Sequence, residues 1–322
     1  MKKYYFYILT FLILTSCSSL KNKASNKNEK LDIVTFNKGV TIFEMVDELS
    51  IDWELQRLDT LKQNEKVKYE ILKNEKEEIL ELALDQFGKI IQDYPNSELY
   101  HKSLYNLAHI SSLLDYEEDE IKYLEMILNS NANDKENSGR SGIMSNPYAN
   151  FKNDASKRLT EIHINKGEYK TALKYKKLNE KYPLQHFCGN AFAADEIYNA
   201  KQYAKIYIGL GDNEKVLSYL LPHIFNNGLA SNSSLVELTT NFLKENYSQE
   251  KLRTDFENST KNIYSKVEKN GDNEWTNYYI KYFDSEIEIP SWSLSFETDN
   301  EKTKSELEKT IKESEFYKKL NE

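Results

Sequence analysis

The segment LALDQFGKIIQDYPNSELYHKSLYNLAHIS, residues 82–111, decides the expected fold of this chain. Ala83, Phe87 and Ile90 recur at spacings of four and three, which places them on one face of a helix. Pro95 then ends that helix, because proline cannot continue the hydrogen-bonded turns. A second apolar face follows at once, made of Leu104, Leu107, Ala108 and Ser111. The segment therefore predicts two helices joined by a short turn.

The same helix–turn–helix pattern returns further along the chain. A third helical face follows the turn at residues 115–116, with Ile121, Leu124 and Leu128. The next pair spans residues 159–182 around a turn at Gly167, and another pair surrounds a turn at Gly211. Glycine and proline are otherwise scarce, at 10 and 5 copies in 322 residues, so long helices are favoured over a barrel or sandwich.

This arrangement resembles tetratricopeptide repeats, which are pairs of antiparallel helices. Ala83 and Ala108 stand where that family places small residues at helix crossings, and Pro95 stands near the end of a helix, as the family does. The resemblance covers about residues 79–228 and implies a solenoid whose first helices line an inner binding surface. By that resemblance six residues face a partner groove: Tyr105, His109, Lys157, Glu161, Lys201 and Lys205.

Helical periodicity also flanks the repeats. Ile42, Phe43, Val46 and Leu49 predict a helix from residue 41, and further helices are expected at about 52–74 and 77–93. After the repeats, Leu235, Leu238 and Phe242 share one helix face. Ser248 is a suitable N-cap for another helix, whose face is formed by Leu252, Phe256, Ile263 and Val267.

The pattern changes to alternation near the C-terminus. Residues 278–283 and 286–289 alternate on both sides of Asp284-Ser285, which predicts a β-hairpin. A hairpin alone is marginally stable, so a third strand is expected to pack beside it. Residues 31–36 alternate weakly and are one candidate for that strand. A terminal helix is expected at about 301–319.

The expected fold class is all-α: a tetratricopeptide-like helical-repeat solenoid with a C-terminal cap of a small β-hairpin plus a helix. The expected domains are a signal peptide at 1–16, a lipidated N-terminus and flexible tether at 17–40, the solenoid at 41–270, and the cap at 271–322.

The N-terminus has the sequence features of a secretory signal. Lys2 and Lys3 precede an apolar run at residues 4–14, which is too short to span a bilayer comfortably. The following Leu14-Thr15-Ser16-Cys17 resembles the lipobox of bacterial lipoproteins. The resemblance implies cleavage between Ser16 and Cys17 and a lipid on Cys17, with palmitate among its acyl chains. An uncleaved membrane anchor with an incidental cysteine is the alternative.

The lipobox resemblance also implies a compartment. Ser18 follows the cysteine, as in lipoproteins that go on to the outer membrane, and no acidic residue typical of surface export follows it. We therefore expect an outer-membrane lipoprotein of the cell envelope that faces the periplasm. The net charge of −9 and the absence of a basic cluster argue against a nucleic-acid partner.

No residue pattern indicates catalysis or a cofactor. The five histidines lack metal-ligand spacing, and the lone pair of His186 and Cys188 has no second pair to complete a zinc site. Residues 139–142 are one residue short of a nucleophile elbow, and residues 129–137 lack the glycine and glutamate of a calcium loop. The chain is therefore expected not to be an enzyme and to hold no metal or cofactor.

The segment from Leu184 to Phe192 departs from the repeat pattern. Its ordinary interpretation is a buried connection between repeats, in which Gly189 provides a turn and Asn190 caps the next helix. The functional alternative is a ligand pocket at the bend.

Three functions are compatible with these features. The first is a lipid-anchored scaffold that binds a protein or peptide partner through its helical-repeat surface. The second is an outer-membrane assembly lipoprotein, because residues 87–108 look like the repeat lipoprotein of the β-barrel assembly machine. The third is an envelope enzyme or solute-binding lipoprotein with a cleft between solenoid and cap, lined by residues near 186–192 and 275–292.

Overall fold

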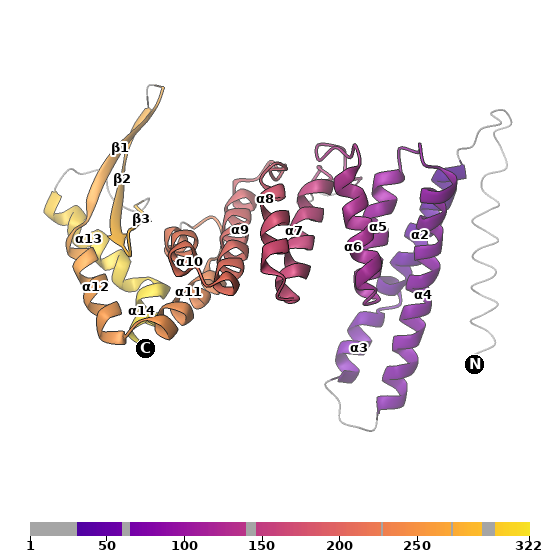
Figure 1. The fold of residues 1–322 in the computed structure, drawn as a ribbon, viewed down its shortest axis with the longest axis horizontal. Helices are drawn as coiled ribbons and strands as arrows, with labels where there is room; N and C mark the ends of the chain where they lie inside the picture. Colours follow the sequence, from indigo (N-terminus) through magenta and orange to yellow (C-terminus); the bar gives the residue numbers. More distant parts are fainter. Residues whose placement is uncertain (1–30, 60–64, 140–145, 227, 272, 292–299) are drawn as a thin grey trace. The chain divides into compact units, whose positions relative to one another are not determined.

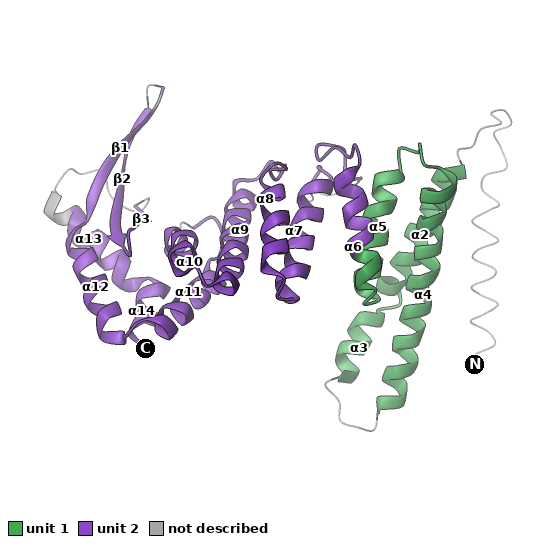
Figure 2. Ribbon diagram, viewed as in Figure 1, with its two compact units in different colours: residues 1–120 green, residues 121–322 purple. Residues whose placement is uncertain are grey.

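The computed structural model describes residues 31–59, 65–139, 146–226, 228–271, 273–291 and 300–322. Most of these residues are helical, and a small antiparallel sheet lies near the C-terminus (Figure 1). The chain divides into two compact units, Met1–Glu120 and Ile121–Glu322 (Figure 2). The expected signal peptide, Ser16, Cys17 and most of the expected tether lie outside the described residues. No described helix is both long and apolar enough to cross a membrane.

The first unit is built on one long helix. Three helices, α2 (Leu31–Glu48), α3 (Ile51–Asp59) and α5 (Tyr100–Leu113), pack against α4 (Lys66–Asp93). The predicted faces of α4 and α5 are confirmed, since their apolar residues form the core: Ala83, Phe87, Ile90, Leu104, Leu107 and Ala108. The expected stop at Pro95 is also confirmed, because α4 ends at Asp93 with Tyr94 as its C-cap.

Four expectations for the first unit were wrong: the strand at 31–36, the start of the first helix, the place of Leu49 on it, and the break between residues 74 and 77. Residues 31–36 are helical and open α2, so they form no strand. The helix begins ten residues before the expected start because Gly39 and Val46 of α2 are buried and the helix packs along α4. Leu49 lies beyond the end of α2 and is 60% exposed. The expected break between residues 74 and 77 is absent, and α4 runs through it.

The second unit continues the helical pattern. Helix α6 (Glu117–Asn129) starts before the boundary between the units. The other helices are α7 (Phe151–Asn165), α8 (Tyr169–Asn179), α9 (Gly189–Leu210), α10 (Asn213–Leu220), the 3-10 turn η2 (Leu221–His223), α11 (Ser233–Asn246) and α12 (Gln249–Lys261). Helix α8 packs on α7 and on α9, and α9 also packs on α10.

The predicted turns of this unit are confirmed. Gly167 and Gly211 both adopt positive φ, at 72° and 73°, which a residue without a side chain tolerates best. Asp212 caps α10 by accepting from the Lys215 backbone N–H at 3.2 Å. Ser248 caps α12 in the same way through the Lys251 backbone N–H, at 3.3 Å.

The sheet contains β1 (Tyr264–Asn270), β2 (Asn273–Tyr282) and β3 (Ser285–Ile289), in that order and all antiparallel. The predicted β2–β3 hairpin is confirmed, with Ile280 opposite Ile287. The third strand is β1, and the expected helix therefore ends early, at Lys261. Val267 was expected on that helix, but it pairs with Thr276 of β2.

The cap is closed by α13 (Asn300–Glu313) and α14 (Glu315–Asn321). One continuous helix was expected here, but Ser314 interrupts it and caps α14 through the Tyr317 backbone N–H at 3.2 Å. Phe316 is fully buried and its ring meets those of Phe256 and Tyr282. The apolar core thus continues from the helices into the cap, which starts at residue 264, before the expected boundary at 271.

Candidate functional site

The structure divides the six predicted groove residues between the two units. Tyr105 and His109 lie on α5 of the first unit, where the His109 ring meets that of Phe43 edge-on at 5.8 Å. The other four lie in the second unit, with Lys157 and Glu161 on α7 and Lys201 and Lys205 on α9.

Three of these four residues line one pocket. We call it the α7–α9 groove; it has a volume of about 300 Å³ and is lined by Glu161, Ile164, Asn165, Tyr198, Lys201, Gln202 and Lys205. Each lining residue comes from α7 or α9, which pack against each other. Lys157 is not part of the lining; its ammonium is ion-paired with Asp195 and lies 5.7 Å from the centre of the Tyr198 ring.

The charged side chains of the α7–α9 groove differ in the interactions that they make. The Glu161 carboxylate accepts from the Tyr198 hydroxyl, and burial together with this bond raises the tyrosine pKa. Burial lowers the pKa of Lys201, and the nearby charge of Lys205 lowers it further. Lys201 donates to the Ser234 hydroxyl at 2.8 Å, but among the described residues neither lysine has an ion-pair partner. The groove therefore holds two neighbouring positive charges that an anion would stabilise.

A buried lysine lies beside this groove. Lys176 of α8 is 1% exposed, and its ammonium donates to three side-chain amide oxygens, those of Asn179 (3.2 Å), Gln202 (3.0 Å) and Asn199. Burial lowers the pKa of Lys176 to about 7, and Lys157 adds to this effect. Asp195 and Glu180 act in the opposite direction.

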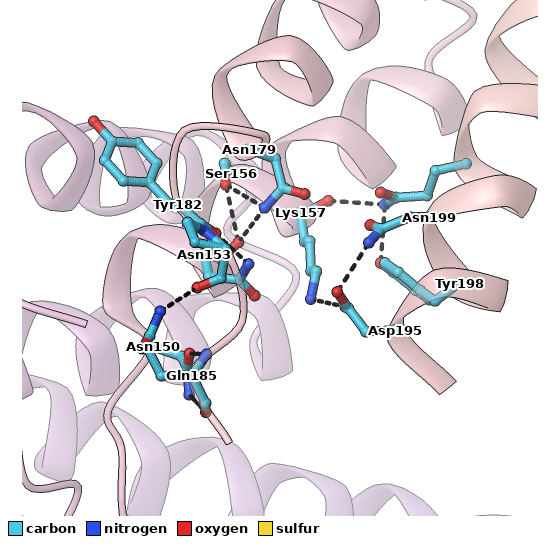
Figure 3. A network of polar contacts seen from close by, with 12 residues as sticks. Asn150, Asn153, Ser156, Lys157, Asn179, Tyr182, Gln185, Asp195, Tyr198 and Asn199 are labelled. Atoms are coloured by element: carbon cyan, nitrogen blue, oxygen red, sulfur yellow. Dashed lines mark hydrogen bonds and ion pairs between the residues drawn. The ribbon is translucent and has the colours of Figure 1, made fainter. Parts of the chain in front are cut away.

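Amide side chains extend the network between the helices (Figure 3). The Asn179 amide N–H groups donate to the Asn153 carbonyl at 3.2 Å and to the Ser156 hydroxyl at 2.9 Å, which joins α8 to α7. The Gln202 amide donates to the Lys157 carbonyl at 3.1 Å and to the Tyr198 hydroxyl at 2.9 Å, which joins α9 to α7. Sequence reasoning missed this network, because its members lie far apart along the chain and show no periodic pattern.

A second pocket opens where α8 ends. We call it the α8–α9 pocket; its volume is about 370 Å³, and its wall comes from α7, α8, α9 and residues 182–184. Polar walls are provided by Asn153, Lys176 and Glu180, and the rings of Tyr182 and Phe192 lie at the same pocket.

The segment from Leu184 to Phe192 is not the buried connection of its ordinary interpretation, and two of its residues, Leu184 and Phe192, line the α8–α9 pocket. Phe187 and Phe192 are 58% and 41% exposed, so the expected burial is wrong. Backbone bonds hold the segment instead: the Gln185 N–H donates to the Asn150 side chain at 2.7 Å, and Asn150 donates back to the Gln185 carbonyl at 3.0 Å. Helix α9 begins at Gly189 after Cys188, and Asn190 therefore does not cap it.

The cleft expected beside the cap has a counterpart in the second unit. A pocket of about 250 Å³ includes Glu196, His223 and Glu288, and a neighbouring one of about 430 Å³ reaches α13 and α14. Glu288 and Pro290 fall in the expected range 275–292, whereas no residue of 186–192 lines either pocket. Within the described part of the chain, no cluster of three His, Cys, Asp or Glu residues has metal-binding geometry.

No protein-family model, curated protein or solved structure matched the chain.

Proposed function

We propose that this protein is a lipid-anchored scaffold of the cell envelope, whose helical pairs form a tetratricopeptide-like solenoid that binds a protein partner. The α7–α9 groove receives an acidic, carboxylate-bearing segment of that partner. The anchor is the lipid on Cys17, which concentrates the scaffold at the membrane where its partner resides.

The observation that carries this proposal is the pair of lysines in the groove. Lys201 and Lys205 are one helical turn apart on α9, and the charge of Lys205 lowers the pKa of Lys201. Two like charges this close repel each other, so a carboxylate placed between them gains from both. Glu161 keeps its negative charge when it accepts from Tyr198, but the two lysines outnumber it, so the lining of the groove has a net positive charge.

The direct test is binding of a fluorescent tetraglutamate peptide, measured by anisotropy on the detergent-solubilised protein. Replacing both lysines, K201E with K205E, should weaken binding at least tenfold by reversing the charge of the groove. The matched control is K244E, since Lys244 is an exposed lysine of α11 outside the groove. Equal affinity of the double variant and the control would contradict the proposal that the α7–α9 groove binds the acidic segment.

The identity of the partner is tested in cells. A photo-crosslinking amino acid at position 205 should capture an envelope protein that the same group at position 244 does not capture. Capture of a β-barrel assembly component would favour the outer-membrane assembly function. Separately, the C17S variant should lose labelled fatty acid and leave the membrane fraction. If the variant keeps its label and stays in the membrane fraction, lipidation of Cys17 is contradicted, whereas the proposal for the groove is unaffected.

A further inference from the structure

The α8–α9 pocket contains a buried acceptor to which no described residue donates a hydrogen bond. Asn153 is 2% exposed and lines the pocket, and its side-chain oxygen has no hydrogen-bond partner among the described residues. Its amide nitrogen is used, because it donates to the Tyr182 carbonyl at 2.6 Å. Figure 3 shows Asn153 between Asn179 and Tyr182. A buried polar atom without a partner is costly, so a ligand that supplies an N–H donor would relieve that cost.

A second side chain of the pocket, that of Glu196, can also accept hydrogen bonds. The Glu196 carboxylate lines the same pocket and has no hydrogen bond or ion pair among the described residues. The donors of Lys176 and Asn199, in contrast, are occupied. The three hydrogens of Lys176 meet three amide oxygens, and the Asn199 amide donates to Asp195 at 2.9 Å.

Charge and ring content point to a cation. Glu180, Asp195 and Glu196 lie in the lining with Lys176, and even with Lys157 paired to Asp195 the carboxylates outnumber the lysines, so an anion would be repelled. Three rings, those of Tyr182, Phe192 and Tyr203, lie at the pocket, and aromatic faces attract ammonium groups. The volume of about 370 Å³ is within the range of small-ligand pockets.

We propose that the α8–α9 pocket binds a primary alkylammonium group, with Asn153 and Glu196 as acceptors and Phe192 against its alkyl chain. The group comes either from a free diamine or from a lysine side chain of a peptide. This site is distinct from the α7–α9 groove, because the two pockets share no lining residue.

Lys176 couples this binding to pH. Its ammonium is the one positive charge among the lining residues, and Glu180 of its own helix, Lys157 of α7 and Asp195 of α9 act on it. An incoming cation favours the neutral amine of Lys176, whose pKa is about 7. Affinity should therefore increase from pH 6 to pH 8, where an alkylamine remains charged.

The test is isothermal titration of the full-length, detergent-solubilised protein at pH 6 and pH 8. The probes are cadaverine and the capped tripeptide Gly-Lys-Gly, with the same tripeptide acetylated on its lysine as a negative probe. We expect one amine probe to bind with at least threefold higher affinity at pH 8, and the acetylated peptide not to bind. The tighter probe identifies the source of the ammonium group.

Two exposed aromatic residues provide a matched pair of variants. F192A removes a ring of the pocket, whereas F187A removes an exposed ring five residues earlier that does not line it. We expect F192A and E196Q each to weaken amine binding at least fivefold, and F187A to leave it unchanged. Absence of amine binding at millimolar concentrations, or equal affinities of F192A and F187A, would overturn the proposal. Binding of tetraglutamate to F192A separates this result from a failure of the α7–α9 groove.

Discussion

Lys176 is the residue at which burial and charge oppose each other most directly. Its three amide acceptors match the three hydrogens of an ammonium, yet burial favours the neutral amine and lowers its pKa from 10.5 to about 7. Between these two pKa values the unfolded chain binds more protons than the folded protein. The contribution of Lys176 to the free energy of unfolding therefore rises with pH in this interval.

We predict that K176M removes this pH dependence. The wild-type protein should gain about 2 kcal/mol of unfolding free energy from Lys176 between pH 7 and pH 9, because one unit of pKa difference corresponds to about 1.4 kcal/mol. Urea denaturation followed by circular dichroism measures it. The control is K177M, because Lys177 is the exposed neighbour on the same helix. If K176M keeps the slope of the wild type, the buried lysine is not responsible.

The amide network predicts a large effect at one position. N179A removes one of the three acceptors of Lys176 and the donor to Ser156 and to the Asn153 carbonyl, so one ammonium hydrogen loses its partner and the other two groups each lose one hydrogen bond. We expect a loss of about 1–3 kcal/mol in the free energy of unfolding. The exposed Asn258 of α12 provides the comparison, since N258A should change stability by less than about 0.5 kcal/mol. Equal losses in both variants would show that the amide network does not contribute to the free energy of unfolding.

Sequence reasoning found the groove lysines and missed the network for a physical reason. Lys201 and Lys205 are four positions apart, so helical geometry alone places them on one face. Asn199 and Gln202 of α9, in contrast, become acceptors of Lys176 only because α8 packs on α9. No local pattern in the sequence indicates that α8 packs on α9.

At the scale of the elements, α8 and α9 approach closely at one glycine. A β-carbon on Gly209 would lie 2.3 Å from the Tyr169 ring. G209A should therefore lower the unfolding free energy by about 1–3 kcal/mol through overpacking. Gly189, in the first turn of the same helix, has open space around it, so G189A should cost nothing. Thermal unfolding of both variants measures this, and equal melting temperatures would contradict the close approach.

Elements with strong local signals, including the β2–β3 hairpin, were predicted, whereas β1, which depends on its pairing with β2, was not. The turns at Gly167 and Gly211 carry their own backbone requirement in the sequence. In contrast, Val267 fits the helical spacing from Phe256 and also fits a strand. Pairing of Val267 with Thr276 of β2 decides between them, and a single-sequence pattern contains no information on that partner.

At the scale of the whole molecule, the chain contains two compact units. The sequence did not indicate this division, because it falls within the helical pattern of α6. Leu80 is fully buried in the first unit and Leu252 in the second. Since each unit has its own contacts, loss of one core should open that unit before the other.

We therefore predict separate effects of L80A and L252A, each costing about 2–5 kcal/mol in its own unit. Hydrogen exchange detected by mass spectrometry should show faster exchange over residues 65–113 in L80A, and over residues 233–289 in L252A. Faster exchange throughout the chain in either variant would mean that the two units unfold together.

The β2–β3 turn has a consequence for the order of folding. Phe283 and Asp284 both have positive φ, 46° and 60°, which costs a bulky residue about 1–2 kcal/mol. The Phe283 ring packs against Tyr247 and Tyr282, with centroids 4.7 Å apart in each case. Tyr282 belongs to the hairpin itself, whereas Tyr247 directly follows α11, so the second ring contact forms only once that helix is in place. We therefore expect the hairpin to form late in folding, with the helices that precede it along the chain acting as its template.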